Sequence, residues 1–224
     1  MDREQHIIHS WNANAGNWID IIGRNGIESR NLITNNAIID AISKSNPSSV
    51  LDIGCGEGWL AKELFNKGIE VTGVDVVPAL IDKAKQKLPG DFYVASYDDI
   101  ASNHFTFSKL FDAIVINFAL IGKESTENLL PALSRNLSGK GTLFIQTLHP
   151  YSRKTINDYT SGWKEGSWDG LGEQFTQPYQ WYFRIMEDWL YLLHQSGFKN
   201  TTVTEIFHPK TNNPLSVIFT CSIN

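Results

Sequence analysis

The sequence predicts an α/β protein with a doubly wound sheet of seven strands, mostly parallel, and helices on both faces. The first observation is an apolar run that ends at Asp52 and leads through three glycines, residues 54–58, into a helical pattern. The second is that strand-like and helix-like patterns alternate as far as residue 148. The third is a pair of strand-like runs near the C-terminus. Their short connection contains Pro209 and Pro214, which indicates an antiparallel hairpin.

The composition is that of an ordinary globular protein, because 42% of the 224 residues are apolar and 19% are charged. This length suits one domain with a full core. The formal net charge is −5 and Lys and Arg do not cluster, so a nucleic-acid partner is not expected. No apolar run reaches the about 18 residues of a membrane span, and we expect a cytoplasmic protein. Two cysteines, Cys55 and Cys221, make no disulfide framework.

Two helices are expected before the first strand. Apolar residues recur at steps of three and four over residues 4–22, which predicts an amphipathic helix, with a break near Gly16 as the alternative. A second helical pattern covers residues 31–43, and Pro47 separates it from the strand.

The elements after the glycine loop follow from periodicity and from the Gly and Pro residues at their ends. Gly68 ends the helix that begins at Trp59, and Pro78 opens the next helix. Residues 111–116 are almost wholly apolar, as expected of a strand buried on both faces. The other predicted strands are residues 69–74, 91–95, 142–148, 198–207 and 215–222, and the other predicted helices are residues 126–137 and 184–195.

The glycine loop is suited to hold a ligand, because residues without a Cβ let a small molecule lie against the backbone. The helix that follows begins with unpaired N–H groups. Asp52 is placed to accept hydrogen bonds from the loop. The order is Asp-x-Gly-x-Gly-x-Gly, and Trp59 stands where a dinucleotide-binding loop has its third glycine. The phosphate-binding pattern G-x-x-x-x-G-K-[ST] is absent.

The loop, together with Asp75 at the end of the next apolar run, resembles motif I and the second landmark of the class I S-adenosylmethionine-dependent methyltransferases of the small-molecule type. The resemblance spans about residues 33–224 and implies a Rossmann-like sheet, with S-adenosylmethionine as cofactor and S-adenosylhomocysteine as product. It implies that the Asp75 carboxylate accepts both ribose hydroxyls. The cofactor-binding residues that it implies are Trp11, Arg30, Asp52, Gly54, Gly56, Gly58, Asp75, Val76, Ser96, Tyr97, Asp98, Asn117 and Phe118.

Three of these positions leave alternatives open. Arg30 is either a solvated surface residue or a partner for the cofactor's carboxylate. Ser96 stands where the family often has an acidic residue, so Ser96 or Asp98 must bind the adenine amino group; Asp98 or Asp99 could instead cap a helix. Asn117 is not followed by the Pro-Pro-Tyr/Phe of enzymes that methylate glutamine or DNA-base nitrogens, which disfavours that chemistry.

Residues 149–183 contain nine aromatic residues and four glycines, which excludes a disordered linker. Because the segment follows the fifth strand, we expect a lid over the acceptor site. An aromatic mini-core or a dimer contact is the alternative. The expected organisation is a methyltransferase domain formed by residues 1–148 and 184–224, with an N-terminal helical cap over residues 1–30 and the lid as an insertion.

Methyl transfer does not require a fixed catalytic side chain, although a general base helps a hydroxyl or ammonium nucleophile. His149, at the end of the fifth strand, is the candidate base, with a substrate-orienting or structural role as the alternative. Neither a metal nor a nucleophilic cysteine is expected, because the pair His6 and His9 has no carboxylate cluster and Cys55 lies in the cofactor loop. The candidate substrate-contacting residues are Gln146, Tyr151, Trp163 and Tyr182.

The predicted function is methyl transfer to an oxygen, nitrogen or carbon nucleophile of a small molecule, by a monomer or homodimer. The alternatives are a macromolecular acceptor (protein or RNA), a non-catalytic cofactor-binding protein and a nucleotide-binding oxidoreductase.

Overall fold

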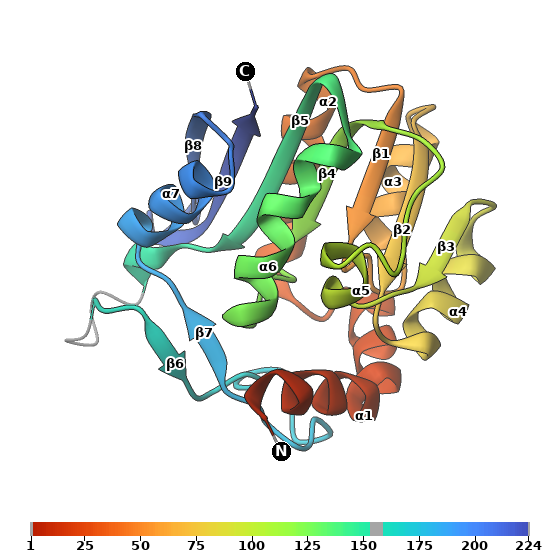
Figure 1. The fold of residues 1–224 in the computed structure, drawn as a ribbon. Coiled ribbons are helices and arrows are strands. Elements are labelled where there is room, and N and C mark those ends of the chain that lie inside the picture. The colour runs from red at the N-terminus through yellow and green to blue at the C-terminus, as the bar shows by residue number, and fades with distance from the viewer. Residues whose placement is uncertain (1, 153–158, 224) are drawn as a thin grey trace.

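The computed structural model describes residues 2–152 and 159–223. Seven strands form one sheet in the order β3-β2-β1-β4-β5-β9-β8 (Figure 1). The strands are β1 Ser49–Ile53, β2 Glu70–Asp75, β3 Asp91–Val94, β4 Phe111–Asn117, β5 Leu137–Leu148, β8 Asn200–Phe207 and β9 Pro214–Ser222. β1 to β5 are parallel, and β9 is antiparallel to both β5 and β8. The predicted fold class, including the C-terminal hairpin, is confirmed.

Helices cover both faces of this sheet (Figure 1). Side chains alternate along the central strands, so Leu51 and Ile114 pack with α5, α6 and α7 on one face. Val50 and Val115 pack with α2, α3 and α4 on the other face. The helices are α1 Arg3–Gly23, the π-helix η1 Arg30–Thr34, α2 Asn35–Lys44, α3 Trp59–Asn66, α4 Pro78–Lys87, α5 Tyr97–Ala101, α6 Glu124–Ala132, the 3₁₀ helix η2 Leu133–Asn136 and α7 Met186–Gln195.

Three details differ from the sequence predictions. α1 runs through Gly16 without a break, because this exposed glycine lies on the solvent side of a helix whose other face is buried. The helix expected over residues 31–43 begins one residue earlier as a π-helix. The helix cap considered at Asp98 or Asp99 is instead Ser96, which caps α5, and the Asp99 side chain accepts from the Ser96 backbone in a capping box.

The inserted segment folds back over α1 (Figure 1). β6 Gly162–Lys164 and β7 Trp181–Phe183 pair as a two-stranded antiparallel sheet. Residues 153–158 of the predicted lid lie outside the described residues. In the described part of the chain, no helix is long and apolar enough to cross a membrane.

Polar side chains on the buried face of α1 bind the inserted segment. The side chain of Asn14, fully buried, donates to the carbonyl oxygen of Thr176 at 2.7 Å and accepts from its backbone N–H at 2.9 Å. Trp168 Nε1 donates to the Ser10 hydroxyl at 3.0 Å, and the Trp11 and Trp168 rings meet edge to face at 4.9 Å. We call α1 and residues 159–183 together the roof.

Candidate functional site

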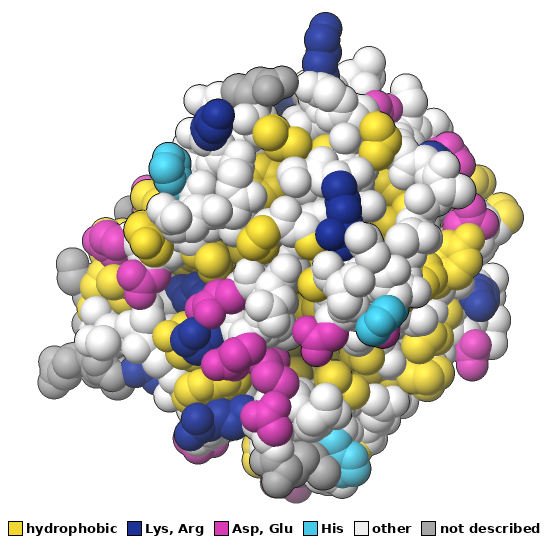
Figure 2. All heavy atoms as spheres, in the orientation of Figure 1, with side chains coloured by type: hydrophobic (Ala, Val, Ile, Leu, Met, Phe, Trp, Pro, Cys, Tyr) yellow, Lys and Arg dark blue, Asp and Glu magenta, His cyan; other side chains and the backbone are white. Residues whose placement is uncertain are grey.

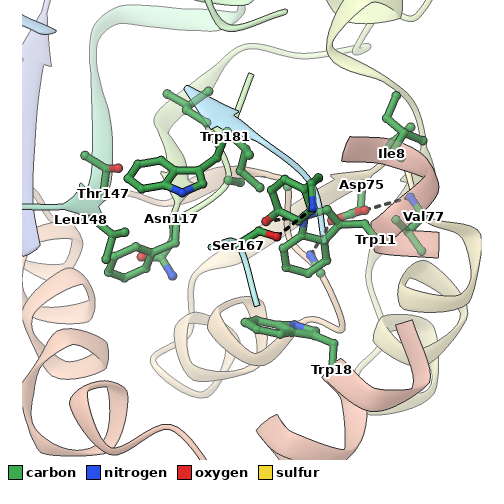
Figure 3. Close-up of a pocket in the computed structure, with 18 of the residues that line it drawn as sticks. Ile8, Trp11, Trp18, Asp75, Val77, Asn117, Thr147, Leu148, Ser167 and Trp181 are labelled. Atoms are coloured by element: carbon green, nitrogen blue, oxygen red, sulfur yellow. Dashed lines mark hydrogen bonds between the residues drawn. The ribbon is translucent and has the colours of Figure 1, made fainter. Parts of the chain in front are cut away.

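A cavity of about 470 Å³ lies between the roof and the carboxyl ends of the central strands (Figure 3). Ligands bind at this edge in open α/β sheets, because the loops after parallel strands diverge there. The walls come from every layer: Trp11 and Trp18 from α1, the glycine loop after β1, Asp75 at the tip of β2, Asn117 at the tip of β4 and Trp181 from β7.

The three glycines of the loop have different roles. All three have positive φ, at 71°, 56° and 80° for Gly54, Gly56 and Gly58. A Cβ at Gly54 would overlap the Cβ of Ala119, and one at Gly58 would lie 2.9 Å from the Cβ of Ala84. A Cβ at Gly56 would meet only Trp18 Nε1, at 3.8 Å. Gly54 and Gly56 line the cavity, and Gly56 leaves its backbone open to a ligand. Gly58 instead allows close packing against α4.

Asp75, rather than Asp52, holds the glycine loop. One oxygen of the Asp75 carboxylate accepts the Gly56 N–H and the other accepts the Val77 N–H, both at 2.9 Å. Each oxygen keeps a second lone pair that can accept from a ligand. Asp52 is 2% exposed, and its Oδ2 has no partner among the described residues. The prediction that Asp52 accepts from the loop is wrong, because the N–H groups of Gly54 and Cys55 donate to the Val74 carbonyl and that of Gly56 donates to Asp75.

Burial raises the pKa of both aspartates. The pKa of Asp52 rises to about 8, mainly by desolvation and then by the charges of Asp75 and Glu57. Desolvation also raises the pKa of Asp75, to about 6, although the backbone N–H groups of Val77, Gly56 and Val76 oppose it. The pKa values of these neighbours therefore differ, and at neutral pH Asp75 is mostly ionised while Asp52 is mostly protonated.

Stability is expected to fall as the pH rises from 5 to 8, and Asp52→Asn should remove most of this dependence. The Asp52 carboxyl loses its proton near pH 4 in the unfolded chain but near pH 8 in the folded protein, so the folded state binds more protons between these values. The free energy of unfolding should decline by on the order of a few kcal/mol. Denaturant titrations at pH 5, 6, 7 and 8 measure it. Asp82→Asn, at an exposed site on α4, is the matched control, and parallel pH curves for both variants would contradict the assignment.

Arg30 is buried between two tryptophans at the cavity wall. Its guanidinium carbon lies 4.6 Å from the ring centre of Trp59 and 5.6 Å from that of Trp18, and its Nε donates to Asn35 Oδ1 at 3.3 Å. Desolvation lowers the pKa of Arg30 to about 10, so the group stays cationic at neutral pH. The π-helix η1 directs the side chains of Arg30 and Thr34 to the cavity. The expectation of a solvated surface arginine is therefore wrong.

Backbone geometry is unusual at the tip of β4. Phe118 has a φ of 54°, which is uncommon for a residue with a large side chain, and its N–H donates to the Gln146 carbonyl at 2.7 Å. Asn117 Oδ1 is buried and has no partner among the described residues. Ser96, Tyr97 and Asp98 line the cavity nearby, after β3. The Tyr97 hydroxyl donates to the Ala119 carbonyl at 2.9 Å, and burial raises its pKa.

The chain is similar to proteins of a known family. Residues 30–203 match the family model described as a methyltransferase domain. The chain belongs to this family. An uncharacterized methyltransferase of Schizosaccharomyces pombe is 28% identical to this methyltransferase domain over 182 residues, which cover 79% of the chain and 68% of the relative.

Two further relatives show how far the similarity extends. A ubiquinone biosynthesis O-methyltransferase of Xanthomonas oryzae is 30% identical over 105 residues, 45% of the chain and 43% of that enzyme, so the match spans less than half of each. The solved structure of a magnesium protoporphyrin IX methyltransferase from Synechocystis, with bound S-adenosylhomocysteine, has a TM-score of 0.67 at 17% identity. The two structures cover 98% and 99% of each other and share the fold.

The structure separates the residues predicted for the site of this methyltransferase domain into two groups. The cavity is lined by Trp11, Arg30, Gly54, Gly56, Asp75, Val76, Ser96, Tyr97, Asp98, Asn117, Phe118 and Tyr182. The residues outside its lining are Asp52, Gly58, Gln146, His149, Tyr151 and Trp163.

His149 is turned away from the cavity. Its side chain is 1% exposed, Nε2 lies 2.8 Å from Glu205 Oε1 on β8, and Nδ1 accepts the Tyr151 N–H at 3.1 Å. Both ring nitrogens are therefore occupied. This contradicts the placement expected of a general base and agrees with the alternative of a structural histidine.

The sequence predictions missed several lining residues. Thr147 faces the cavity, whereas its neighbour Gln146 points to the opposite side and donates to the Thr34 carbonyl and the Ser216 hydroxyl. Because successive side chains of a strand point to opposite faces, the prediction of Gln146 missed the cavity-lining residue, Thr147, by one position. Trp59 and Trp181 also line the cavity. Trp59 could have been predicted from its position directly after the glycine loop.

Proposed function

We propose that the cavity binds S-adenosylmethionine and that the protein transfers its methyl group to a small molecule. The observation that carries this proposal is the arrangement of Asp75 against the open backbone of Gly56, with its carboxylate facing the cavity. Each carboxylate oxygen can still accept a hydrogen bond, which suits two adjacent ribose hydroxyls.

The other polar groups of the cavity suit the remaining parts of this cofactor. Arg30 is a buried cation that can pair with the methionine carboxylate. Asn117 Oδ1 needs a hydrogen-bond donor, because a buried oxygen without a partner is unfavourable. Ser96 and Asp98 can accept from the adenine amino group, since both line the cavity after β3. Trp11 supplies an apolar wall from α1.

The chemistry also explains why the cavity is roofed. S-adenosylmethionine supplies an electrophilic methyl group on a sulfonium. The protein's own residues orient the two reactants and exclude water, which strengthens the electrostatic interactions inside the site. The roof supports this role because Trp168 and Tyr179 join α1 while both line the cavity. The aromatic mini-core is thus part of the lid, and the two interpretations coexist.

A small acceptor is preferred over a macromolecular one. The cavity lies beneath the roof, whose Trp168 and Tyr179 line it, and an enclosed site of this kind suits a small acceptor. Figure 2 shows acidic and basic side chains mixed on the face that carries α6, without a basic patch. The relatives named for ubiquinone biosynthesis and for magnesium protoporphyrin support a small acceptor as well.

Calorimetry with S-adenosylmethionine and S-adenosylhomocysteine tests the cofactor assignment. We expect both ligands to bind one site per chain, with affinities in the micromolar range or tighter. Isotopically labelled methyl donor added to a metabolite extract then identifies the product that gains the label. The assignment fails if neither ligand binds at high micromolar concentration. Cofactor binding without label transfer to any product would favour a non-catalytic binding protein.

A further inference from the structure

The part of the cavity farthest from Asp75 has apolar walls. Figure 3 shows Trp181, Thr147, Leu148 and Asn117 on one side of the cavity and Asp75 and Val77 on the other. We call this part the acceptor chamber. Its lining residues are Leu120, Ile121, Thr147, Leu148, Trp181 and Tyr182. If the cofactor lies along the glycine loop and Asp75, the acceptor must approach from this chamber.

Charged groups next to the acceptor chamber are already bound. The Glu4 carboxylate accepts from the Glu124 N–H at 2.9 Å and the Ser125 hydroxyl at 2.7 Å, at the start of α6. Arg184 donates to the carbonyls of Gly122 and Lys123, at 3.2 and 3.0 Å. Within residues 2–152 and 159–223, no other charged side chain lines this part of the cavity. An ionised acceptor would lose hydration without gaining a free counter-charge.

Trp181 presents a ring held in place by the roof. Its Nε1 donates to the Glu165 carbonyl at 3.1 Å, so its indole N–H is bound by the roof itself. The next residue in β7, Tyr182, anchors the strand because its backbone N–H donates to the Ile121 carbonyl at 2.8 Å. A flat apolar wall in a fixed position favours a flat partner.

Few polar atoms remain for the acceptor. Among the residues named for the chamber, they are the hydroxyls of Thr147 and Tyr182. A hydroxyl can donate one hydrogen bond and can also accept. The chamber therefore matches a molecule that carries a hydroxyl group on an otherwise apolar frame.

We propose that the acceptor is a neutral, planar, conjugated small molecule that carries a hydroxyl group and packs against Trp181. This proposal rests on the proposed function of the same cavity. In the transfer, the hydroxyl oxygen bonds to the methyl carbon, the carbon–sulfur bond breaks with its electron pair remaining on sulfur, and the hydroxyl proton leaves to water.

The test compares three probes that share one two-ring carbon frame: 2-naphthol, 6-hydroxy-2-naphthoate and decahydro-2-naphthol. Each is titrated into the full chain at saturating S-adenosylhomocysteine, after binding of that product has been measured separately. We expect 2-naphthol to bind at least about 10-fold more tightly than the carboxylate and the saturated alcohol. Trp181→Ala should remove about 10-fold of this affinity, whereas Trp181→Phe should retain most of it. Tyr191→Ala, on the exposed side of α7, is the matched control.

The outcomes separate the two proposals. No binding of S-adenosylhomocysteine would contradict the proposed function itself. Binding of that product, combined with a preference for the carboxylate that is lost in Arg184→Gln, would assign Arg184 as an anion site and overturn the neutral acceptor. Equal affinities for the planar and saturated probes, no detectable binding of 2-naphthol, or an unchanged affinity in Trp181→Ala would overturn the stacking role.

Discussion

Replacing Asp75 by alanine is expected to weaken S-adenosylmethionine binding by about 10- to 150-fold, which corresponds to roughly 1.5–3 kcal/mol for a lost charge-assisted contact. The loss has two sources, because the carboxylate faces the cavity and also accepts the N–H groups of Gly56 and Val77. Calorimetry measures the affinity, and thermal unfolding measures stability in parallel. Asp82→Ala is the control, since Asp82 is an exposed residue of α4.

The pH dependence gives a second readout of the same residue. Because the pKa of Asp75 is about 6, protonation below that pH should weaken cofactor binding, and binding should recover as the pH rises through 6. Asp75→Ala should lose this dependence. An unchanged affinity together with a large fall in melting temperature would show that Asp75 is structural only.

Replacing Asn14 by alanine is expected to separate the two parts of the roof and to lower kcat/KM by about 10- to 100-fold. The substitution removes both hydrogen bonds to the Thr176 backbone, and the unsatisfied groups cost roughly 1–3 kcal/mol. Hydrogen exchange in residues 159–183 should accelerate, while cofactor affinity changes less than turnover. Asn12→Ala is the matched control, because the Asn12 amide donates only to the Ile8 carbonyl within α1.

Exchange measured with and without ligands extends this test. We expect the segment to become more protected when S-adenosylhomocysteine and an acceptor are both present. If exchange in Asn14→Ala matches that of the unmodified protein, the roof does not depend on this contact. If protection changes with protein concentration instead of ligand, the segment is an oligomer contact and the lid proposal is wrong.

The sheet and much of the cofactor side could be predicted because their signals are local. The apolar run before Gly54, the glycine spacing and the position of Asp75 all lie within 25 residues, and parallel strands bring their carboxyl ends to one edge. The direction of Asp52 could not be predicted in the same way. A one-residue change of phase in a strand decides whether a side chain meets the loop or the interior.

The docking of the roof and the role of His149 could not be predicted, because both depend on contacts between residues far apart in the sequence. Ser10 and Asn14 interrupt the apolar stripe of α1, and nothing local indicates that backbone groups of the inserted segment bind them. His149 was placed correctly at the end of β5, but its partner Glu205 lies 56 positions later, on β8. The register of that strand decides whether Glu205 reaches the imidazole, and the sequence does not reveal it.

The two parts of the roof, α1 and residues 159–183, are synthesised at different times, and this affects the order in which their contacts form. α1 is synthesised before the elements that it contacts, and Ala15 on its inner face can soon pack against Val77 and Leu80 near the start of α4. Its aromatic contacts come much later, since Trp11 and Tyr179 are separated by 168 positions. Closing so long a loop carries a high entropic cost and slows contact formation. The sheet and α1 can therefore assemble before residues 159–183 dock, so the cavity is expected to be covered last.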